Sequence, residues 1–216
     1  MSVSAPDHPT DLIERIRAAH ADRTPLRIEG GNTKAFIGTV PDAAVLSTAG
    51  YAGILSHEPS ELVLTARAGT PLTELEAALA AHGQCLPFEP PHLGAGATVG
   101  GMVAAGLAGP ARASVGAVRD YVLGVRLVNG RGELLTFGGQ VMKNVAGYDV
   151  SRAVAGSWGT LGLIAEVSLK VLSVAPAEAT LVFPLAQHEA LEQLHRWGGQ
   201  PLPLNASCWV KDEAST

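Results

Sequence analysis

Apolar and polar residues alternate most regularly between residues 161 and 172. The apolar side chains stand at every second position: Leu163, Ala165, Val167, Leu169 and Val171. Successive side chains of a strand point to opposite faces, so this period of two predicts a strand with those five residues on one buried face. The residues between them, Glu166, Ser168 and Lys170, are predicted to lie on the other face.

Weaker patterns predict the elements that precede this strand. Short apolar runs bounded by turn residues predict strands at residues 25–28, 45–48 and 62–66. Apolar residues at helical spacing predict a helix over residues 11–20. A second helix, following residue 71, is predicted to bury three leucines: Leu72, Leu75 and Leu79.

Both helices carry start signals in the sequence. Asp11, with Glu14 three residues later, has the spacing of a capping box. Thr70 is predicted to cap the second helix with Pro71 in its first position. Gly83 is predicted to end that helix in a left-handed conformation.

A hairpin is predicted from strands at residues 122–128 and 133–137, joined by the turn at 129–132. Residues 87–116, in contrast, show no period and consist largely of Gly, Ala and Pro. Loops this long within a domain are usually functional or disordered. Their low polarity does not suit a solvated linker, which favours a function.

The pattern after Pro176 predicts one β-α-β unit, with a strand at 180–183, a helix at 187–197 and a strand at 205–210. One such unit cannot cover its own sheet. We therefore predict two domains, residues 1–175 and an incomplete second domain at 176–216. The alternative is that the unit packs on the first domain as a terminal appendage.

Composition excludes several classes of protein. Of 216 residues 47% are hydrophobic, which excludes intrinsic disorder, and a net charge of −5 without a basic run argues against nucleic acid as a partner. Cys85 and Cys208 are too isolated for a disulfide scaffold or a zinc site. The first 20 residues lack the apolar core of a signal peptide, and the uncharged stretch 93–111 has too many small residues to span a membrane. These features predict a cytoplasmic protein without a transmembrane segment.

The first segment that could carry chemistry is residues 28–34, where a predicted strand runs into five candidate binding residues: Gly30, Gly31, Asn32, Thr33 and Lys34. Glycines allow neighbouring backbone N–H groups to converge on one anion, and the Asn, Thr and Lys side chains add donors and a charge. A phosphate or pyrophosphate would suit this loop, which lacks the Walker A spacing. An ordinary turn is the alternative.

The second segment, residues 90–106, places small residues where a backbone could approach a large flat ligand. Its candidate residues are Pro91, Gly94, Thr98, Val99, Gly100, Gly101, Ala104 and Gly106. The Gly spacing is one residue too long for a Rossmann fingerprint, and no strand precedes it, so we reject that site. His92 is interpreted as a surface or hydrogen-bonded loop residue in preference to a catalytic one.

A third segment, residues 156–164, leads directly into the alternating strand and supplies the remaining candidates: Gly156, Gly159, Gly162, Leu163 and Ile164. A tight connection packed on the sheet is the alternative. No catalytic residue is assigned, because no GxSxG motif occurs and the seven histidines lack the H-x-x-x-H metal spacing. Asp120 and Asp149 lie near turns and are predicted to bind backbone N–H groups.

Taken in order, residues 28–34, 61–70, 98–101 and 156–164 resemble the FAD-binding PCMH-type domain of the vanillyl-alcohol oxidase/p-cresol methylhydroxylase superfamily. The resemblance covers roughly residues 8–175. It implies an α+β fold of two subdomains with FAD between them, followed by a cap domain. Only the start of a cap is present here, so the predicted fold ends in a truncated α+β cap.

Three further segments, residues 86–92, 100–110 and 141–149, are similar to the FAD-binding subunits of bacterial glycolate oxidases. That resemblance implies oxidation of glycolate, a small 2-hydroxy acid, to glyoxylate. It also implies two partners, a catalytic flavoprotein subunit and an iron–sulfur subunit, through which the protein would associate with membranes. No histidine matches a position of covalent flavin attachment, so non-covalent FAD is expected.

The resemblance also distributes the candidate residues over the cofactor. Backbone N–H groups of residues 30–33 and 98–101 would hold the pyrophosphate, and residues 162–164 the adenine. Ala104, Ala105 and Gly106 would lie along the flavin ring. Two other hypotheses remain open: a stand-alone flavin oxidoreductase with another substrate, and a flavin-less assembly protein that keeps the fold.

Overall fold

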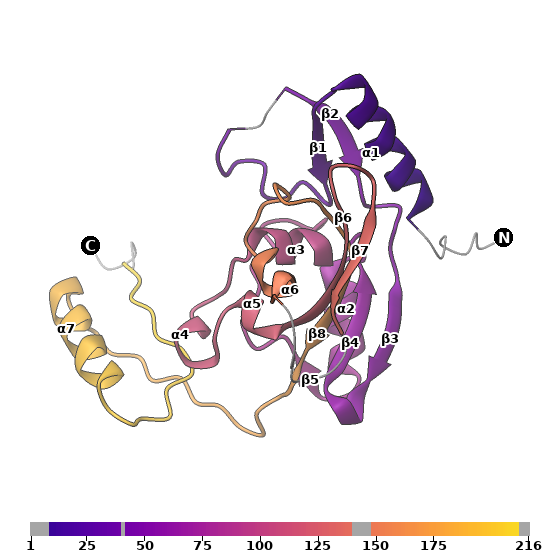
Figure 1. Cartoon of the computed structure of the whole chain (residues 1–216). Coiled ribbons are helices and arrows are strands. Elements are labelled where there is room, and N and C mark those ends of the chain that lie inside the picture. The colour runs from indigo at the N-terminus through magenta and orange to yellow at the C-terminus, as the bar shows by residue number, and fades with distance from the viewer. Residues whose placement is uncertain (1–8, 40–41, 140–147, 212–216) are drawn as a thin grey trace.

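The computed structural model describes residues 9–39, 42–139 and 148–211. A small α/β unit sits at one end of a larger sheet, helices pack on that sheet, and a C-terminal segment extends away from both (Figure 1). The predicted α+β fold with two subdomains is confirmed.

The first unit packs α1 (Thr10–Asp22) on two parallel strands, β1 (Leu26–Glu29) and β2 (Ala44–Ser47). The predicted helix and strands are confirmed to within two residues, but the capping box is wrong. The residue before the helix is Pro9, and no side chain caps the helix. Because the helix starts before Asp11, that carboxylate lies within the first turn, where it can still favour the positive end of the helix dipole.

The second unit is an antiparallel sheet in the order β3-β4-β8-β6-β7. Its strands are β3 (Ile54–Glu58), β4 (Val63–Arg67), β8 (Leu163–Lys170), β6 (Val122–Val128) and β7 (Leu134–Gly138). The predicted β6–β7 hairpin is confirmed. Strand β3 was not predicted, because it is an edge strand of mixed polarity with an irregular register. A short pair, β5 (Gln84–Cys85) and β9 (Leu172–Ser173), lies beside the sheet.

Helices supply the other half of the larger core. They are α2 (Leu72–Ala80), α3 (Val99–Ala105), α5 (Val118–Tyr121) and α6 (Val150–Ala153), with α4 (Arg112–Val115) and the 3₁₀ turn η1 (Pro59–Glu61) nearer the surface. The three leucines predicted to face inward from α2 are fully buried. Thr70 does not cap α2: its hydroxyl lies 2.7 Å from the Arg67 carbonyl oxygen and accepts the Gly53 N–H.

Strand β8 contributes to both cores, which corrects the prediction of a single buried face. Leu163 and Ala165 pack in the first unit, whereas Ile164 and Val167 pack in the second. The cause is a β-bulge: Arg126 pairs with Glu166, but its neighbour Leu127 pairs with Ile164. The extra residue on β8 reverses which face each later side chain occupies.

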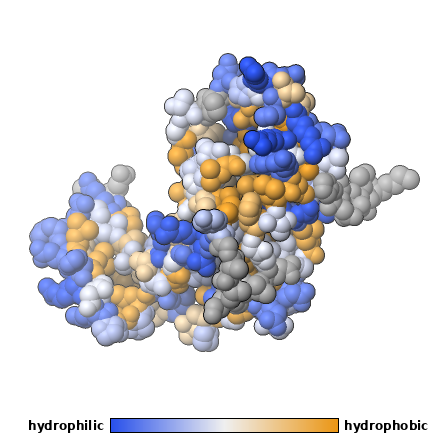
Figure 2. All heavy atoms as spheres, in the orientation of Figure 1, coloured by the Kyte–Doolittle hydropathy of each residue, from blue (hydrophilic) through white to orange (hydrophobic). Residues whose placement is uncertain are grey.

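The C-terminal segment contains α7 (Gln187–Gly198), which confirms the predicted helix. The two strands predicted at 180–183 and 205–210 are absent: no strand follows Ser173 in the part of the chain that the structure describes. No strand of the sheet lies beside these residues to complete their backbone hydrogen bonds. Apolar and polar side chains are mixed over this segment at the left of Figure 2, and among its described residues only Ala190 is buried.

Sparse contacts hold this segment together. The rings of Phe183 and Trp197 are 5.2 Å apart, and the Trp209 indole N–H donates to the Leu185 carbonyl oxygen. One hydrogen bond, 2.6 Å long, joins Ser114 to the Leu204 carbonyl. The domain boundary near residue 176 stays a prediction. Of the helices in the described ranges, none has the length and apolar character needed to cross a membrane.

Candidate functional site

The first two glycine-rich segments, distant in sequence, meet backbone to backbone. A Cβ on Gly31 would overlap the carbonyl oxygen of Gly96, and one on Gly30 would overlap the hydroxyl of Thr98. A Cβ on Gly94 would lie 3.1 Å from the Thr33 methyl group. Glycine is therefore required at this contact for close approach, and the structure brings both predicted loops into one site.

The third segment joins the same site from the other side. The Gly156 N–H donates to the Val103 carbonyl and the Trp158 N–H to the Ala104 carbonyl, at 3.0 and 2.9 Å. Gly106 has a φ of +64°, and a Cβ there would lie 2.9 Å from the Gly156 backbone. These contacts bring the end of α3 against the third segment.

The loop at residues 30–33 presents unpaired backbone donors. In the described part of the chain, none of its four N–H groups donates a hydrogen bond to the protein. Asn32 has a left-handed φ of 54°, which turns neighbouring N–H groups toward a common point. Burial lowers the pKa of the adjacent Lys34 ammonium below its ordinary value. This donor set and charge fit a phosphate or pyrophosphate.

The N–H groups at the start of α3 are not available in the same way. Val99 donates to the Thr70 carbonyl and Gly100 to the Ala68 carbonyl, at 2.9 and 2.8 Å. The Gly101 N–H donates to the hydroxyl of Thr98 at 3.2 Å. Three of the four N–H groups expected to bind an anion, those of residues 99–101, therefore already have a protein acceptor, which does not favour an anion-binding role for them.

The side chain of Thr98 remains as a donor at this point. Thr98 is 6% exposed and lies directly behind Gly30. Its oxygen accepts the Gly101 N–H, but its own hydroxyl proton has no acceptor among the residues described. A buried hydroxyl aimed at the first loop can complete its hydrogen bonding with an anion held there.

The remaining candidate cofactor-binding residues differ in their exposure to solvent. Pro91, Ala104, Gly106, Gly159 and Gly162 are half-buried and Gly156 is exposed. Ala105, placed beside the flavin by the resemblance, is buried in the core, so its methyl group cannot line a ligand site. Leu163 and Ile164 are also buried, which leaves only their backbone for a ligand. Of the segment 141–149, residues 141–147 lie outside the described residues.

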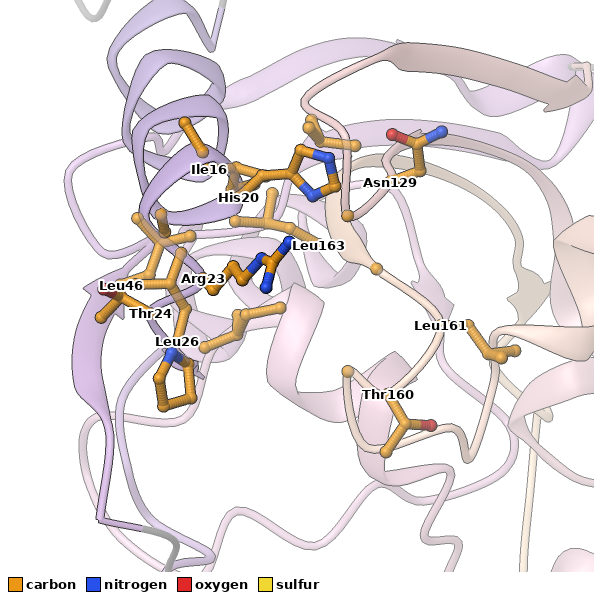
Figure 3. A pocket seen from close by; sticks show the side chains of 18 residues that line it. Ile16, His20, Arg23, Thr24, Leu26, Leu46, Asn129, Thr160, Leu161 and Leu163 are labelled. Carbon is orange, nitrogen blue, oxygen red and sulfur yellow. The ribbon is translucent and has the colours of Figure 1, made fainter.

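An open hollow of about 810 Å³ lies between the end of α1, β1, the β6–β7 turn and residues 159–163. Its apolar floor includes Leu26, Ile28 and Leu163. Figure 3 shows His20 of α1 and Arg23, the residue after that helix, extending into the hollow, across from Asn129. Sequence reasoning did not single out these three polar residues. His20 and Arg23 lie at the end of a helix, where basic residues are equally typical of favourable dipole interactions. Asn129 was assigned only to the turn of the hairpin.

Three other predicted residues have structural partners. A carboxylate oxygen of Asp120 accepts the Ala117 N–H at 2.8 Å, and one of Asp149 accepts the Arg152 N–H at 3.2 Å, which confirms both predictions. His92 bonds Glu76 of α2. Within the ranges that the structure describes, no three His, Cys, Asp or Glu side chains gather closely enough to hold a metal ion.

Comparison with known proteins agrees with the geometry of the glycine loops. The family described as "FAD binding domain" matches residues 2–138. The chain belongs to this family. The predicted resemblance and the FAD cofactor that it implies are thereby supported from the loop at 30–34 through the β6–β7 hairpin.

Several curated relatives are longer than this chain. The glycolate oxidase subunit GlcE of Escherichia coli is 49% identical over 94% of the chain, which spans 58% of that protein. A D-lactate dehydrogenase of Archaeoglobus fulgidus is 32% identical over 87% of the chain and 42% of its own length. The glycolate oxidase subunit GlcD of Bacillus subtilis is 31% identical over 80% of the chain and 37% of its own length.

A solved structure shares the fold over most of the chain. Alkyldihydroxyacetonephosphate synthase matches with a TM-score of 0.63 and 25% identity, covering 80% of this chain and 31% of that protein. The fold class predicted from sequence is therefore found in a known structure.

Proposed function

We propose that this protein is the FAD-binding subunit of a glycolate oxidase complex and holds its FAD non-covalently. The observation that carries the proposal is the loop at residues 30–33. Its N–H groups have no protein acceptor among the described residues, and its two glycines lie against Thr98 and Gly96, where a Cβ would overlap. Similarity to the E. coli glycolate oxidase subunit supports the choice of complex and substrate.

The residues present fit the pyrophosphate of FAD with one loop as the main holder. N–H groups of residues 30–33 would donate to the phosphate oxygens, with the Thr98 hydroxyl as a further donor and Lys34 as the nearby positive charge. Ala104, Gly106 and Gly156 would allow the flavin ring to approach the backbone. The hollow beside Leu163 would take the adenosine end, with apolar contacts below and polar groups at its rim.

Two observations bear on attachment and chemistry. The histidine of the second segment, His92, is hydrogen-bonded through Nε2 to Glu76, and its place in the sequence matches no position of covalent flavin attachment, which supports non-covalent binding. Bound FAD would accept the two electrons removed from a 2-hydroxy acid. That reaction needs a base at the hydroxyl and a cation at the carboxylate. The described site loops offer Lys34 as a cation, but their one histidine, His92, is engaged with Glu76. The proposal therefore assigns catalysis to the complex, with the catalytic flavoprotein and iron–sulfur subunits as partners.

The test is the absorbance spectrum of the purified chain before and after acid precipitation. We expect flavin bands in the native protein and all of the flavin in the acid supernatant. Flavin retained in the pellet would contradict non-covalent binding, and colourless protein that takes up no added FAD would contradict the function. Co-purification with an iron–sulfur subunit and a second flavoprotein would support the proposed complex.

The D-lactate dehydrogenase relatives favour one second candidate, a flavin oxidoreductase that acts without partners on another 2-hydroxy acid. Anaerobic mixing distinguishes the two functions. We expect neither glycolate nor D-lactate to bleach the flavin of the isolated chain within seconds. Rapid bleaching by either acid would favour the second candidate.

A further inference from the structure

Residues 90–96, here called the bridging loop, contain the glycines that touch the first cofactor loop. Gly96 lies on Gly31, and Gly94 lies on Thr33. The bridging loop is exposed from Leu93 to Gly96, and two successive residues have positive φ angles, 55° at Leu93 and 143° at Gly94. A segment with few buried contacts and glycine-rich backbone needs some other constraint to keep one conformation.

A single polar contact supplies that constraint. In the described part of the chain, His92 makes the only hydrogen bond that joins the bridging loop to the rest of the protein. Its Nε2 lies 3.1 Å from one carboxylate oxygen of Glu76 and 2.9 Å from the other. Both ends of the loop have their own anchors, because Ala111 donates to Glu89 and Leu72 to the Ala97 carbonyl.

The hydrogen-bond acceptor, Glu76, lies on a well-packed helix. Glu76 is carried by α2, next to Leu75 and one turn from Leu72 and Leu79, all three fully buried in the main core. The backbone that carries the Glu76 carboxylate is therefore held in place by the packing of its helix. His92 differs, because the exposed residues between it and Ala97 touch Gly31 and Thr33 but form no hydrogen bond with the rest of the described chain.

We propose that the Glu76–His92 pair clamps the bridging loop against Gly31 and Thr33 and thereby sets how long FAD stays bound. This inference rests on the proposed function. Both residues are positioning residues, which act through the loop and do not touch the cofactor. Both side chains are about one-third exposed, at 37% and 34%, so the pair contributes little to global stability. The pair instead affects how well ordered the bridging loop is.

The experiment measures FAD release from the full chain by the rise of flavin fluorescence after dilution. We expect Glu76→Gln and His92→Ala each to raise the release rate about three- to fivefold, the size of effect expected when a partly exposed polar pair is weakened or lost. The double variant should be no faster than either single one, because both remove the same interaction. His92→Gln should recover part of the slow release, since its amide can donate to Glu76.

Glu74→Gln is the matched control, because it makes the same charge change on an exposed residue of the same helix. It should release FAD at the unmodified rate, and the unfolding midpoints of all variants should agree closely. Equal rates for Glu76→Gln and Glu74→Gln would overturn the clamp, as would effects that multiply in the double variant.

Backbone NMR relaxation separates this inference from the proposed function. In the chain without FAD, Glu76→Gln should lower the backbone N–H order parameters of residues 93–96, whereas Glu74→Gln should not. An unmodified chain that binds no FAD would refute the function and with it the effect on release. Unchanged order parameters in a chain that does bind FAD would refute the clamp alone.

Discussion

The two glycine-rich loops of the site look alike in sequence but differ in the state of their backbone. At residues 30–33 the N–H groups have no protein acceptor among the described residues, whereas at 99–101 each N–H already donates to a carbonyl or hydroxyl oxygen. The first loop therefore offers donors to a ligand. The second loop instead allows close packing, because its missing side chains let the first loop, the sheet and the third segment come close.

This difference separates two uses of glycine that a motif alone cannot distinguish. Gly100 packs on Ala68, where a Cβ would come within 2.5 Å of the alanine methyl group. Its role is tight packing of α3 on β4, which differs from anion binding. A glycine can therefore serve a cofactor site without meeting the cofactor.

The largest expected effect tests the first loop, at residues 30–33, as a source of hydrogen-bond donors. Gly31→Val would force the loop away from Gly96 and disturb the four N–H groups, so FAD affinity should fall at least tenfold, or about 1.4 kcal/mol, in flavin fluorescence titrations. Gly198→Val in α7 is the control, since a Cβ there meets nothing within 4 Å and the residue lies in neither loop. Unchanged flavin content in Gly31→Val would remove this loop from the site.

A smaller effect comes from the charge beside that loop. Burial lowers the pKa of Lys34, so the ammonium loses its proton at a lower pH than an exposed lysine. The protonated form attracts the pyrophosphate, and FAD affinity should therefore fall as pH rises through that lowered pKa. Removing the charge with Lys34→Gln should weaken binding about threefold at neutral pH and flatten the alkaline fall.

Lys34→Arg keeps its charge at high pH and is the matched comparison. It should bind FAD with an affinity that is flat across the same alkaline range. A fall that persists unchanged in Lys34→Gln would assign the pH dependence to another group.

The second loop, at residues 99–101, should tolerate the addition of a methyl group. Gly101→Ala places a Cβ 3.1 Å from the Thr98 oxygen, a tight contact within a helix that otherwise favours alanine. FAD affinity should change less than about twofold, in contrast with the tenfold loss expected if the Gly101 N–H bound the phosphate. A tenfold loss in Gly101→Ala would show that the two loops share the donor role.

The smallest effect is expected from removing the C-terminal segment. A chain ending at residue 175 loses α7 but none of the residues that form either loop. Its FAD affinity should match that of the full chain, and limited proteolysis of the full chain should cut first beyond residue 176. Loss of flavin on truncation, or a first cut between residues 20 and 165, would show that the segment belongs to the FAD domain.

Sequence alone located the elements whose apolar residues have partners nearby. α1, α2 and the β6–β7 hairpin are found close to their predicted bounds, because their periodicity reflects the packing that forms them. The strand predicted at 180–183 has a similar composition but no neighbour, and it does not form. Strand pairing depends on the tertiary structure, which a local pattern cannot report.

The sequence predicted which segments form the candidate site, but it did not predict the contacts between them. The three glycine-rich segments do converge, as the resemblance implied. The acceptors of the Val99 and Gly100 N–H groups lie about thirty residues earlier, at Thr70 and Ala68, so no local signal could reveal that these donors are occupied. The same holds for Glu76, whose partner is in a loop without regular structure.

The bulge in β8 has a consequence for cooperativity. Leu163 and Ala165 belong to the core of the first unit, and Val167 and Leu169, a few residues along the same strand, belong to the other. Neither core can open without displacing a strand that the other needs, so the two units should unfold in one transition. A ligand held by the small unit then stabilises the whole sheet through mass action, including strands far from any phosphate.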